Sequence, residues 1–295
     1  AGGGGPSGAG GVEGTRGRTF VAYGGAMLVD GGCGEGARRA GVPSWQPGPT
    51  RDWLWATLVS TLEVPPLDRV AAFDNDGTLA CEKPASSVGA FLRQVAPASQ
   101  PKDGHDTERL LAQALAGLTP LQAAARAGDF MAAARHPRFH RPYPDLTYQP
   151  MVELVRLLRR LEFTVFVVSD SSRDFLRVMA PAAYGLAPEC VIGSEAEINW
   201  QGGQLRRQRR VIPLDDGPGK PAHLWDRAGR LPLLATGNAK GDIELLGSAR
   251  HALLVRHDDA HREYAYDDHQ ALAAASSPGW TIVVMREDCA EVLAR

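Results

Sequence analysis

Short apolar runs alternate with stretches of helical periodicity over most of this chain. Five runs carry mainly aliphatic residues and read as buried parallel strands; they span residues 70–73, 164–168, 231–236, 252–255 and 281–285. Between two of them, apolar side chains recur at helical spacing from Met151 to Leu161. The alternation predicts an α/β fold with a doubly wound parallel sheet.

Two insertions interrupt this alternation. Residues 84–148 are rich in alanine and leucine and contain no strong strand pattern, so they predict a small helical cap over the carboxyl ends of the strands. Residues 194–211 predict a hairpin that turns at Gly202-Gly203. The core is then expected to comprise residues 51–83 and 149–295. Within it, residues 51–62 predict a helix, and Pro221 suits the first turn of a second helix that begins near Lys220.

The first 50 residues differ in composition from the rest of the chain. Residues 1–14 are glycine-rich and of low complexity, which predicts disorder. Arg16 and Arg18 then precede a modestly apolar stretch that ends at Asp30-Gly31-Gly32-Cys33, an order similar to a secretory or lipoprotein signal. Gly24, Gly25 and Asp30 weaken that similarity, so a cytoplasmic protein and a lipoprotein exported through Cys33 both remain open.

The overall composition limits the partners to be expected. The 295 residues carry a formal net charge of −2, which gives no general attraction to nucleic acid or anionic membranes. The arginines at positions 206, 207, 209 and 210 lack aromatic or groove-reading companions, so no nucleic-acid partner is expected. No apolar run is long enough to span a membrane. The four cysteines form no CxxC pair, and the oligomeric state is left open.

Polar residues follow the apolar pattern at four places. Asp74-Asn75-Asp76-Gly77-Thr78 follows the first strand, Ser169 ends the second, Lys220 opens a helix, and residues 237–242, which include Asn238 and Asp242, follow the third. Since the carboxyl ends of parallel strands meet at one edge of the sheet, these four segments are expected to converge.

Their residue types suit phosphoryl transfer. One aspartate can attack phosphorus, and a second carboxylate can protonate the leaving oxygen and later deprotonate water. Ser169 and Lys220 can hold the phosphoryl oxygens. A hard cation such as Mg²⁺ would offset the repulsion between carboxylate and phosphate, with oxygen ligands from Asn238 and Asp242. Taken alone, the first segment could also be an Asx-Gly turn; a calcium loop starting at Asp74 would need glycine and glutamate where Leu79 and Ala85 stand.

The four segments in this order resemble the haloacid dehalogenase-like (HAD) hydrolase superfamily in its bacterial phosphatase branch, over about residues 66–290. Residues 134–139, 148–151 and 257–263 extend the resemblance. It implies a HAD-like core with a cap inserted after the first strand, and Mg²⁺-dependent hydrolysis of a small phosphorylated metabolite through an aspartyl-phosphate. It also implies roles for single residues: Asp74 as nucleophile, Asp76 as general acid and base, Thr78, Ser169 and Lys220 as phosphate ligands, and Asp74, the Asp76 backbone carbonyl, Asn238 and Asp242 as metal ligands.

Two positions depart from the pattern of that superfamily. Asp170 stands where glycine is common, with Arg173 as an expected partner, and Asn238 stands where many relatives carry aspartate. Asp76 favours phosphate esters over haloacids. A phosphotransferase or a haloacid dehalogenase on the same fold, or a catalytically impaired phosphate-binding homologue, remain as alternatives.

Residues outside the four segments give weaker indications. Glu82, Arg135 and Arg138 are candidates for substrate contact, because they lie after the first segment and where the cap rejoins the core. His257 and His261 are expected to be structural, since no HExxH pattern accompanies them.

Overall fold

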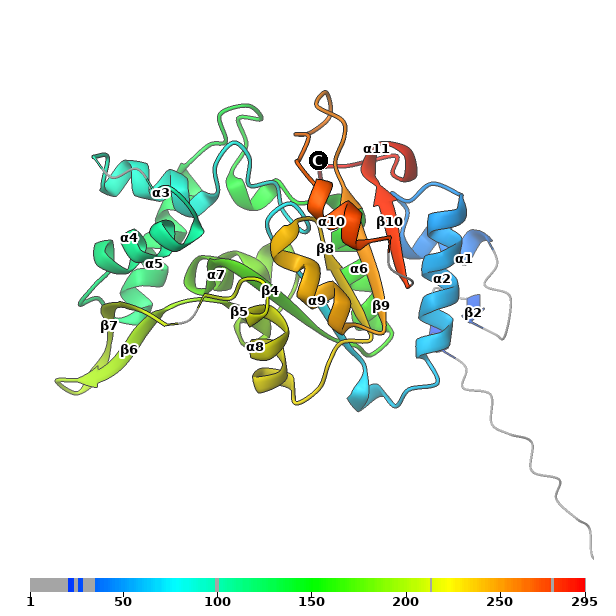
Figure 1. The fold of residues 1–295 in the computed structure, drawn as a ribbon, viewed down its shortest axis with the longest axis horizontal. Coiled ribbons are helices and arrows are strands. Elements are labelled where there is room, and N and C mark those ends of the chain that lie inside the picture. Colours follow the sequence, from blue (N-terminus) through cyan, green and yellow to red (C-terminus); the bar gives the residue numbers. More distant parts are fainter. Residues whose placement is uncertain are drawn as a thin grey trace, which may run out of the picture.

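The computed structural model describes residues 21–23, 26–28, 35–98, 101–212, 214–276 and 279–294 (Figure 1). Arg16, Arg18 and Cys33, on which the similarity to an export signal depends, lie outside these residues. The short strands β1 (Val21–Tyr23) and β2 (Ala26–Leu28) pair with each other in antiparallel fashion. In the described part of the chain, no helix combines the length and apolar character needed to cross a membrane.

A six-stranded parallel sheet forms the centre of the fold, with the strand order β10-β9-β8-β3-β4-β5. The strands are β3 (Val70–Phe73), β4 (Thr164–Ser172), β5 (Val191–Ser194), β8 (Leu234–Gly237), β9 (His251–Arg256) and β10 (Trp280–Val284). The predicted α/β fold with a doubly wound parallel sheet is confirmed. The edge strand β5 was not predicted, because Val191 and Ile192 are too few to stand out as an apolar run.

Alternate side chains of the strands serve two separate cores. Ala71 and Phe73 of β3 pack on one face with α2 (Pro49–Thr61), α6 (Gln149–Arg160) and α7 (Arg173–Ala183). Val70 and Ala72 pack on the other face with α8 (Gly219–Ala228), α9 (Ile243–Ser248) and α10 (His269–Ala274). All four β3 residues are buried, which is why this strand reads as a continuous apolar run.

Residues that precede α2 also pack on the core. Helix α1 (Glu35–Gly41) contacts α6, and the Trp45 ring N–H donates to the Pro150 carbonyl at 3.1 Å. Trp45 is buried and forms a β-bridge with Cys289, just after α11 (Met285–Asp288). The fold therefore uses residues that precede position 51, where the core was expected to begin.

Three helices lie between β3 and α6. They are α3 (Ser87–Val95), α4 (Gly104–Ala114) and α5 (Pro120–Ala133), and each is capped by a side chain at its amino end: Ser86, Asp103 and Thr119. Figure 1 shows them grouped to one side of the sheet. Single-turn 3₁₀ helices occur at Pro66–Asp68, Tyr143–Asp145, Pro188–Cys190 and Lys240–Asp242.

The predicted hairpin is present and packs on this helical insertion. Strands β6 (Ala196–Gln201) and β7 (Gln204–Val211) pair in antiparallel fashion around Gly202 and Gly203, whose φ angles are 56° and 81°. Arg207 exchanges backbone hydrogen bonds with Gly117 and Leu118, just beyond α4. Two insertions far apart in sequence thus lie side by side. The expected domain boundaries at 84–148, 51–83 and 149–295 stay predictions.

Candidate active site

The end of β3 places Asp74 at the join between two central strands. Its backbone N–H donates to the Thr236 carbonyl of β8 at 3.0 Å, and its side chain is buried. The chain then turns tightly, since the Asn75 carbonyl accepts the N–H groups of Thr78, Leu79 and Ala80. Because the strand ends here, the carboxylate leaves the sheet at its carboxyl edge, as the sequence predicts.

Gly77 is required at this turn for two reasons. Its φ angle is +80°, a region that side chains disfavour. A Cβ atom would also stand 2.1 Å from the Asn238 amide nitrogen and 2.9 Å from the Tyr266 ring. The first and fourth polar segments therefore approach each other directly through this glycine.

A buried histidine holds the same turn through a hydrogen bond to the Gly77 carbonyl. His257 Nε2 donates to the Gly77 carbonyl at 2.6 Å, while its Nδ1 lies 2.5 Å from Glu263 Oε2. Both side chains are fully buried, and the rings of Tyr148 and Tyr266 flank the imidazole. These contacts give His257 a structural role, and they explain what the stretch 257–263 does for the site.

Lys220 joins the first segment to the fourth. Its ammonium lies 2.7 Å from Asp74 Oδ1 and 2.5 Å from Asp242 Oδ1. Asp242 Oδ2 accepts the backbone N–H groups of Asn238 and Ala239 at 2.9 and 3.0 Å. Burial lowers the pKa of Lys220, but the charges of Asp242 and Asp74 outweigh this effect and raise the pKa well above its ordinary value. The two carboxylates therefore stabilise the charged form of the lysine.

Asp74 carries more negative charge around it than Lys220 balances. Burial is the largest cause that raises the pKa of Asp74, followed by the charge of Asp242; Lys220 opposes both, and the net pKa lies well above the ordinary value. An additional cation beside Asp74 would favour the ionised form of this carboxylate.

Asp76 is held by two hydrogen bonds. Its Oδ1 accepts from the Asn75 amide at 2.9 Å, and its Oδ2 accepts from the Ser171 hydroxyl. The Tyr184 hydroxyl in turn donates to Asn75 Oδ1 at 2.7 Å. Burial, and then the charge of Glu82, raise the pKa of Asp76 to about 6. A carboxyl group with that pKa can both give and take a proton near neutral pH.

The proposed phosphate ligands lie in different surroundings. Ser169 is fully buried, and its Oγ accepts the Ser171 N–H at 3.2 Å. Thr78 is also buried, and its hydroxyl donates to Asn238 Oδ1 at 3.4 Å. Lys220 lines the cavity described next, whereas Ser169 and Thr78 do not. The register of β4 shifts between Ser169 and Ser172, and this irregularity presents Ser171 in place of Ser169.

A cavity of about 560 Å³ lies in front of these groups and is called here the central cavity. Asp74, Asp76, Lys220, Asn238 and Asp242 all line it. Its opposite wall comes from the helical insertion, through Ser86 and through α4 with Gly104, Thr107 and Glu108. The structure thus brings together both catalytic candidates and three of the expected ligands, under the α4 helix.

Further carboxylates line the central cavity. They are Glu82, Glu108, Asp170, Asp216 and Asp267. Glu82 accepts from the Tyr266 hydroxyl at 2.6 Å. Burial raises the pKa of Asp170 to about 6 against the opposing charge of Lys220. The expected pairing of Asp170 with Arg173 is wrong, because Arg173 forms its ion pair with Glu195. Sequence reasoning missed Ser171, Glu108, Asp216 and Tyr266, which no spacing rule marks.

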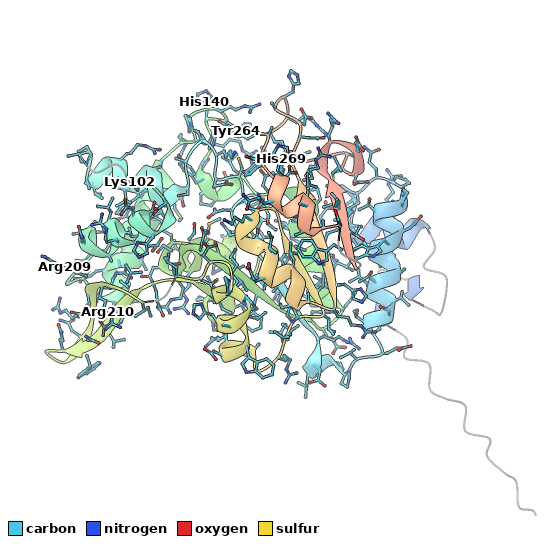
Figure 2. All side chains as sticks on the ribbon, viewed as in Figure 1. Lys102, His140, Arg209, Arg210, Tyr264 and His269 are labelled. Atoms are coloured by element: carbon cyan, nitrogen blue, oxygen red, sulfur yellow. The ribbon has the colours of Figure 1, made fainter. Side chains whose placement is uncertain are left out.

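The two arginine candidates for substrate contact point elsewhere. Arg135 donates to the carbonyls at the end of its own helix, from Ala132 to Ala134. Arg138 donates to carbonyls of the loop 260–263 and stacks on Phe139 and Tyr264. Neither arginine lines the central cavity. Figure 2 shows Arg209 and Arg210 on the hairpin of β6 and β7, at the left end of the view.

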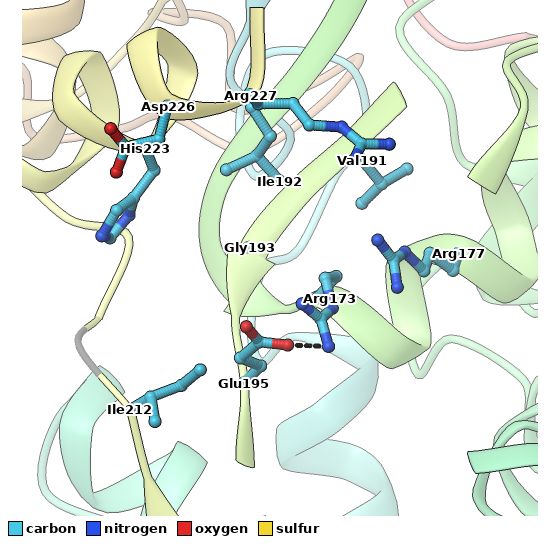
Figure 3. Close-up of a pocket in the computed structure, with 10 residues that line it drawn as sticks. All are labelled: Arg173, Arg177, Val191, Ile192, Gly193, Glu195, Ile212, His223, Asp226 and Arg227. Atoms are coloured by element: carbon cyan, nitrogen blue, oxygen red, sulfur yellow. Dashed lines mark ion pairs between the residues drawn. The ribbon is translucent and has the colours of Figure 1, made fainter. Parts of the chain in front are cut away.

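A second cavity, of about 330 Å³, lies at the edge strand β5 (Figure 3). Arg173, Arg177, Arg227 and His223 surround it, together with the carboxylates of Glu195 and Asp226. The guanidinium groups of Arg177 and Arg227 donate to the carbonyls of Pro188 and Glu189. None of the four polar segments contributes its chemical groups here, so the central cavity is the candidate active site.

The chain belongs to the haloacid dehalogenase-like hydrolases, because that family's sequence model matches residues 71–247, more than half of the chain. Solved structures share the fold. A protein of unknown function from Bordetella pertussis Tohama I aligns with a TM-score of 0.52 and 18% identity over 74% of this chain and 99% of its own. A functionally unknown protein from Anaerococcus prevotii DSM 20548 aligns with a TM-score of 0.53 and 11% identity over 80% and 92%. No curated protein matches the sequence.

Proposed function

We propose that this protein is a Mg²⁺-dependent phosphatase that hydrolyses a small phosphate monoester through an aspartyl-phosphate on Asp74. The observation that carries the proposal is the arrangement around β3. A buried carboxylate at the end of that strand lies 2.7 Å from the Lys220 ammonium. A second carboxylate two residues on lines the same cavity, and burial and the charge of Glu82 raise its pKa to about 6. Membership of the family supports hydrolysis as the reaction class.

The chemistry of the donor set fits a hard divalent cation. Carboxylate and amide oxygens of Asp74, Asp242 and Asn238 line the central cavity, and such oxygens are the ligands that Mg²⁺ prefers. Burial and then the charge of Asp242 raise the pKa of Asp74 in spite of Lys220, so a further cation there would stabilise the carboxylate. Those carboxylate and amide oxygens, with the backbone carbonyl of Asp76, would hold Mg²⁺. Once bound, Mg²⁺ would supply positive charge for the phosphoryl oxygens and keep Asp74 ionised.

In the first half of the reaction, a carboxylate oxygen of Asp74 forms a bond to phosphorus while the bond from phosphorus to the ester oxygen breaks. Asp76, in its protonated form, gives its proton to the departing alkoxide. Ser171 and Asn75 keep Asp76 oriented through their hydrogen bonds. The Lys220 ammonium attracts the phosphoryl oxygens as their charge rises.

In the second half, Asp76 takes a proton from a water molecule, whose oxygen attacks the same phosphorus. The bond from phosphorus to Asp74 breaks, and phosphate leaves. The proton that Asp76 gave to the alcohol is thereby restored, so atoms and charge balance over the cycle. The helical insertion limits the access of bulk water through Glu108 and Thr107 on the opposite wall.

Release of p-nitrophenol and phosphate from p-nitrophenyl phosphate tests this function. We expect turnover with Mg²⁺, loss of turnover with EDTA, and loss in Asp74→Asn with the fold intact by circular dichroism. Asp129→Asn, which removes an exposed carboxylate from α5, is the matched control. Beryllofluoride should be captured on the Asp74 side chain. Turnover that persists in Asp74→Asn would refute the nucleophile, and turnover that ignores EDTA would refute the metal.

A further inference from the structure

The central cavity has far more negative charge than the proposed reaction uses. Eight carboxylates and two lysines line it. Asp74, Asp76 and Asp242 serve the chemistry, and Lys220 is committed to two of them. Five carboxylates then remain with no part in the reaction. These carboxylates repel a phosphate dianion. Their presence in a phosphatase would be explained if another part of the substrate carried positive charge.

Glu108 is the clearest case among these five. Its side chain is 96% buried in α4 and lines the central cavity. It makes no hydrogen bond or ion pair with any residue in the described ranges. The charge of Arg207 reaches it, but Arg207 forms its ion pair with Asp174. A buried carboxylate without a partner is costly, which indicates that its partner is a ligand.

A second carboxylate near Glu108 makes this cost larger. Asp170, from the end of β4, lines the same cavity and lies close to α4, since a Cβ atom on Gly104 would stand 3.5 Å from its Oδ2. Burial and then the charge of Asp170 raise the pKa of Glu108 well above its ordinary value. The helical insertion and the core thus present two like charges to each other, and a cation between them would attract both.

A second metal ion is a poor candidate for that cation. A divalent ion takes about six or more oxygen ligands at short range. Glu108 and Asp170 are two carboxylates and offer fewer oxygen ligands than that. An organic cation, by contrast, needs only opposite charge and space, and a cavity of about 560 Å³ admits a small ester whole.

We propose that the leaving group of the substrate carries a positively charged nitrogen, primary or quaternary, which binds between Glu108 of α4 and Asp170 of the core. This inference rests on the proposed phosphatase function and names its substrate class. The phosphoryl group faces Asp74 and Lys220, and the ammonium faces α4. Because Glu108 belongs to α4 and Asp170 to the end of β4, the bound cation would link the helical insertion to the sheet.

The test compares two esters of nearly the same shape. Phosphocholine and 3,3-dimethylbutyl phosphate differ in that a neutral carbon replaces the quaternary nitrogen. For the natural sequence we expect kcat/KM for phosphocholine to exceed that for the neutral ester at least tenfold. In Glu108→Gln the ratio should fall toward one through a higher KM for phosphocholine. In Asp129→Asn, on the outer face of the neighbouring helix, the ratio should stay as it is.

Binding to Asp74→Asn, measured by calorimetry, repeats the comparison without turnover. Tighter binding of phosphocholine than of the neutral ester supports the inference, even if the protein hydrolyses neither. Equal affinities, or a preference that survives in Glu108→Gln, overturn it. Equal and rapid hydrolysis of both esters would overturn the cationic site while leaving the phosphatase function in place, so the two failures are distinguishable.

Discussion

At the scale of single residues, one lysine holds the site together. Lys220 is the shared cation of Asp74 and Asp242, and all three side chains are buried. We expect Lys220→Met to lower the free energy of unfolding by about 3–5 kcal/mol, because two buried carboxylates lose the ion-pair partner that they share. Phosphatase turnover should disappear as well. Urea denaturation and phosphate release measure the two effects.

Lys240→Met is the control for that substitution. Lys240 lines the same cavity but is exposed, so the unfolding free energy should change by no more than about 0.5 kcal/mol. If Lys220→Met were as stable as Lys240→Met, the buried ion pairs would not be what joins the first and fourth polar segments.

A second residue-scale prediction concerns pH. Burial and the charge of Asp170 raise the pKa of Glu108 in the folded protein above its unfolded value of 4.5. Above pH 4.5 the folded state therefore binds more protons than the unfolded state, and stability falls as the pH rises. Glu108→Gln removes this contribution, so its stability relative to the natural sequence should rise as the pH rises above 4.5.

Urea denaturation of both proteins across that range gives the difference directly. The gain should approach about 1.4 kcal/mol per pH unit where Glu108 alone accounts for the proton difference. Asp170 and Asp76 are coupled to Glu108 by charge, so its removal also eases the ionisation of these two carboxyl groups, and the difference between the two proteins includes that contribution. A difference that stays flat with pH would contradict the burial of an unpaired carboxyl at this position.

At the scale of elements, the strands and their ends are what sequence could predict. Aliphatic runs gave five of the six strands, and parallel pairing was enough to bring Asp74, Lys220 and Asp242 to one edge. That inference needs only the rule that parallel strands end on the same side. It holds because backbone topology, rather than side-chain detail, decides which residues meet.

Side-chain detail is what sequence could not predict. The apolar run that Ser169 ends predicts this serine as a phosphate ligand, whereas the contact of Ser171 with Asp76 depends on the register shift after Ser169. Glu108 lies in the alanine- and leucine-rich segment 84–148, where nothing marks it, and only the docking of α4 places it in the cavity. Arg138 looks like a substrate ligand in sequence but serves as a clamp on the loop 260–263.

The β6–β7 hairpin packs against α4, and a substitution at Arg207 tests what holds the two together. Arg207 of β7 is buried, pairs with Asp174 of α7, and exchanges backbone hydrogen bonds with Gly117 and Leu118. We expect Arg207→Met to cost about 3–5 kcal/mol, since Asp174 loses its cation. The loss should be visible as faster hydrogen exchange at the Gly117 amide.

Arg209→Met is the matched control on the same strand, because Arg209 is exposed. Its amide exchange at Gly117 should equal that of the natural sequence. Unchanged exchange in Arg207→Met as well would mean that the hairpin is held to the helical insertion by the backbone hydrogen bonds alone.

At the scale of the whole molecule, charge is distributed unevenly. The chain as a whole has a formal net charge of only −2, yet eight carboxylates meet two lysines in a single cavity. Folding therefore gathers like charges at one place, and any cation that binds there favours the folded state by mass action. We expect millimolar MgCl₂ to raise the melting temperature by a few degrees, since binding at about 100 times Kd is worth about 2.7 kcal/mol.

Sodium chloride at equal ionic strength separates this binding from general screening. Screening weakens repulsion between exposed charges but acts much less on buried ones, so NaCl should give a smaller shift, and excess EDTA should reverse the effect of MgCl₂. In Asp74→Ala the shift should shrink, because one of the proposed ligands is gone. Equal shifts with both salts, unaltered by Asp74→Ala, would show that no bound Mg²⁺ stabilises the carboxylates of the cavity. The metal-dependent mechanism would then lose its physical basis.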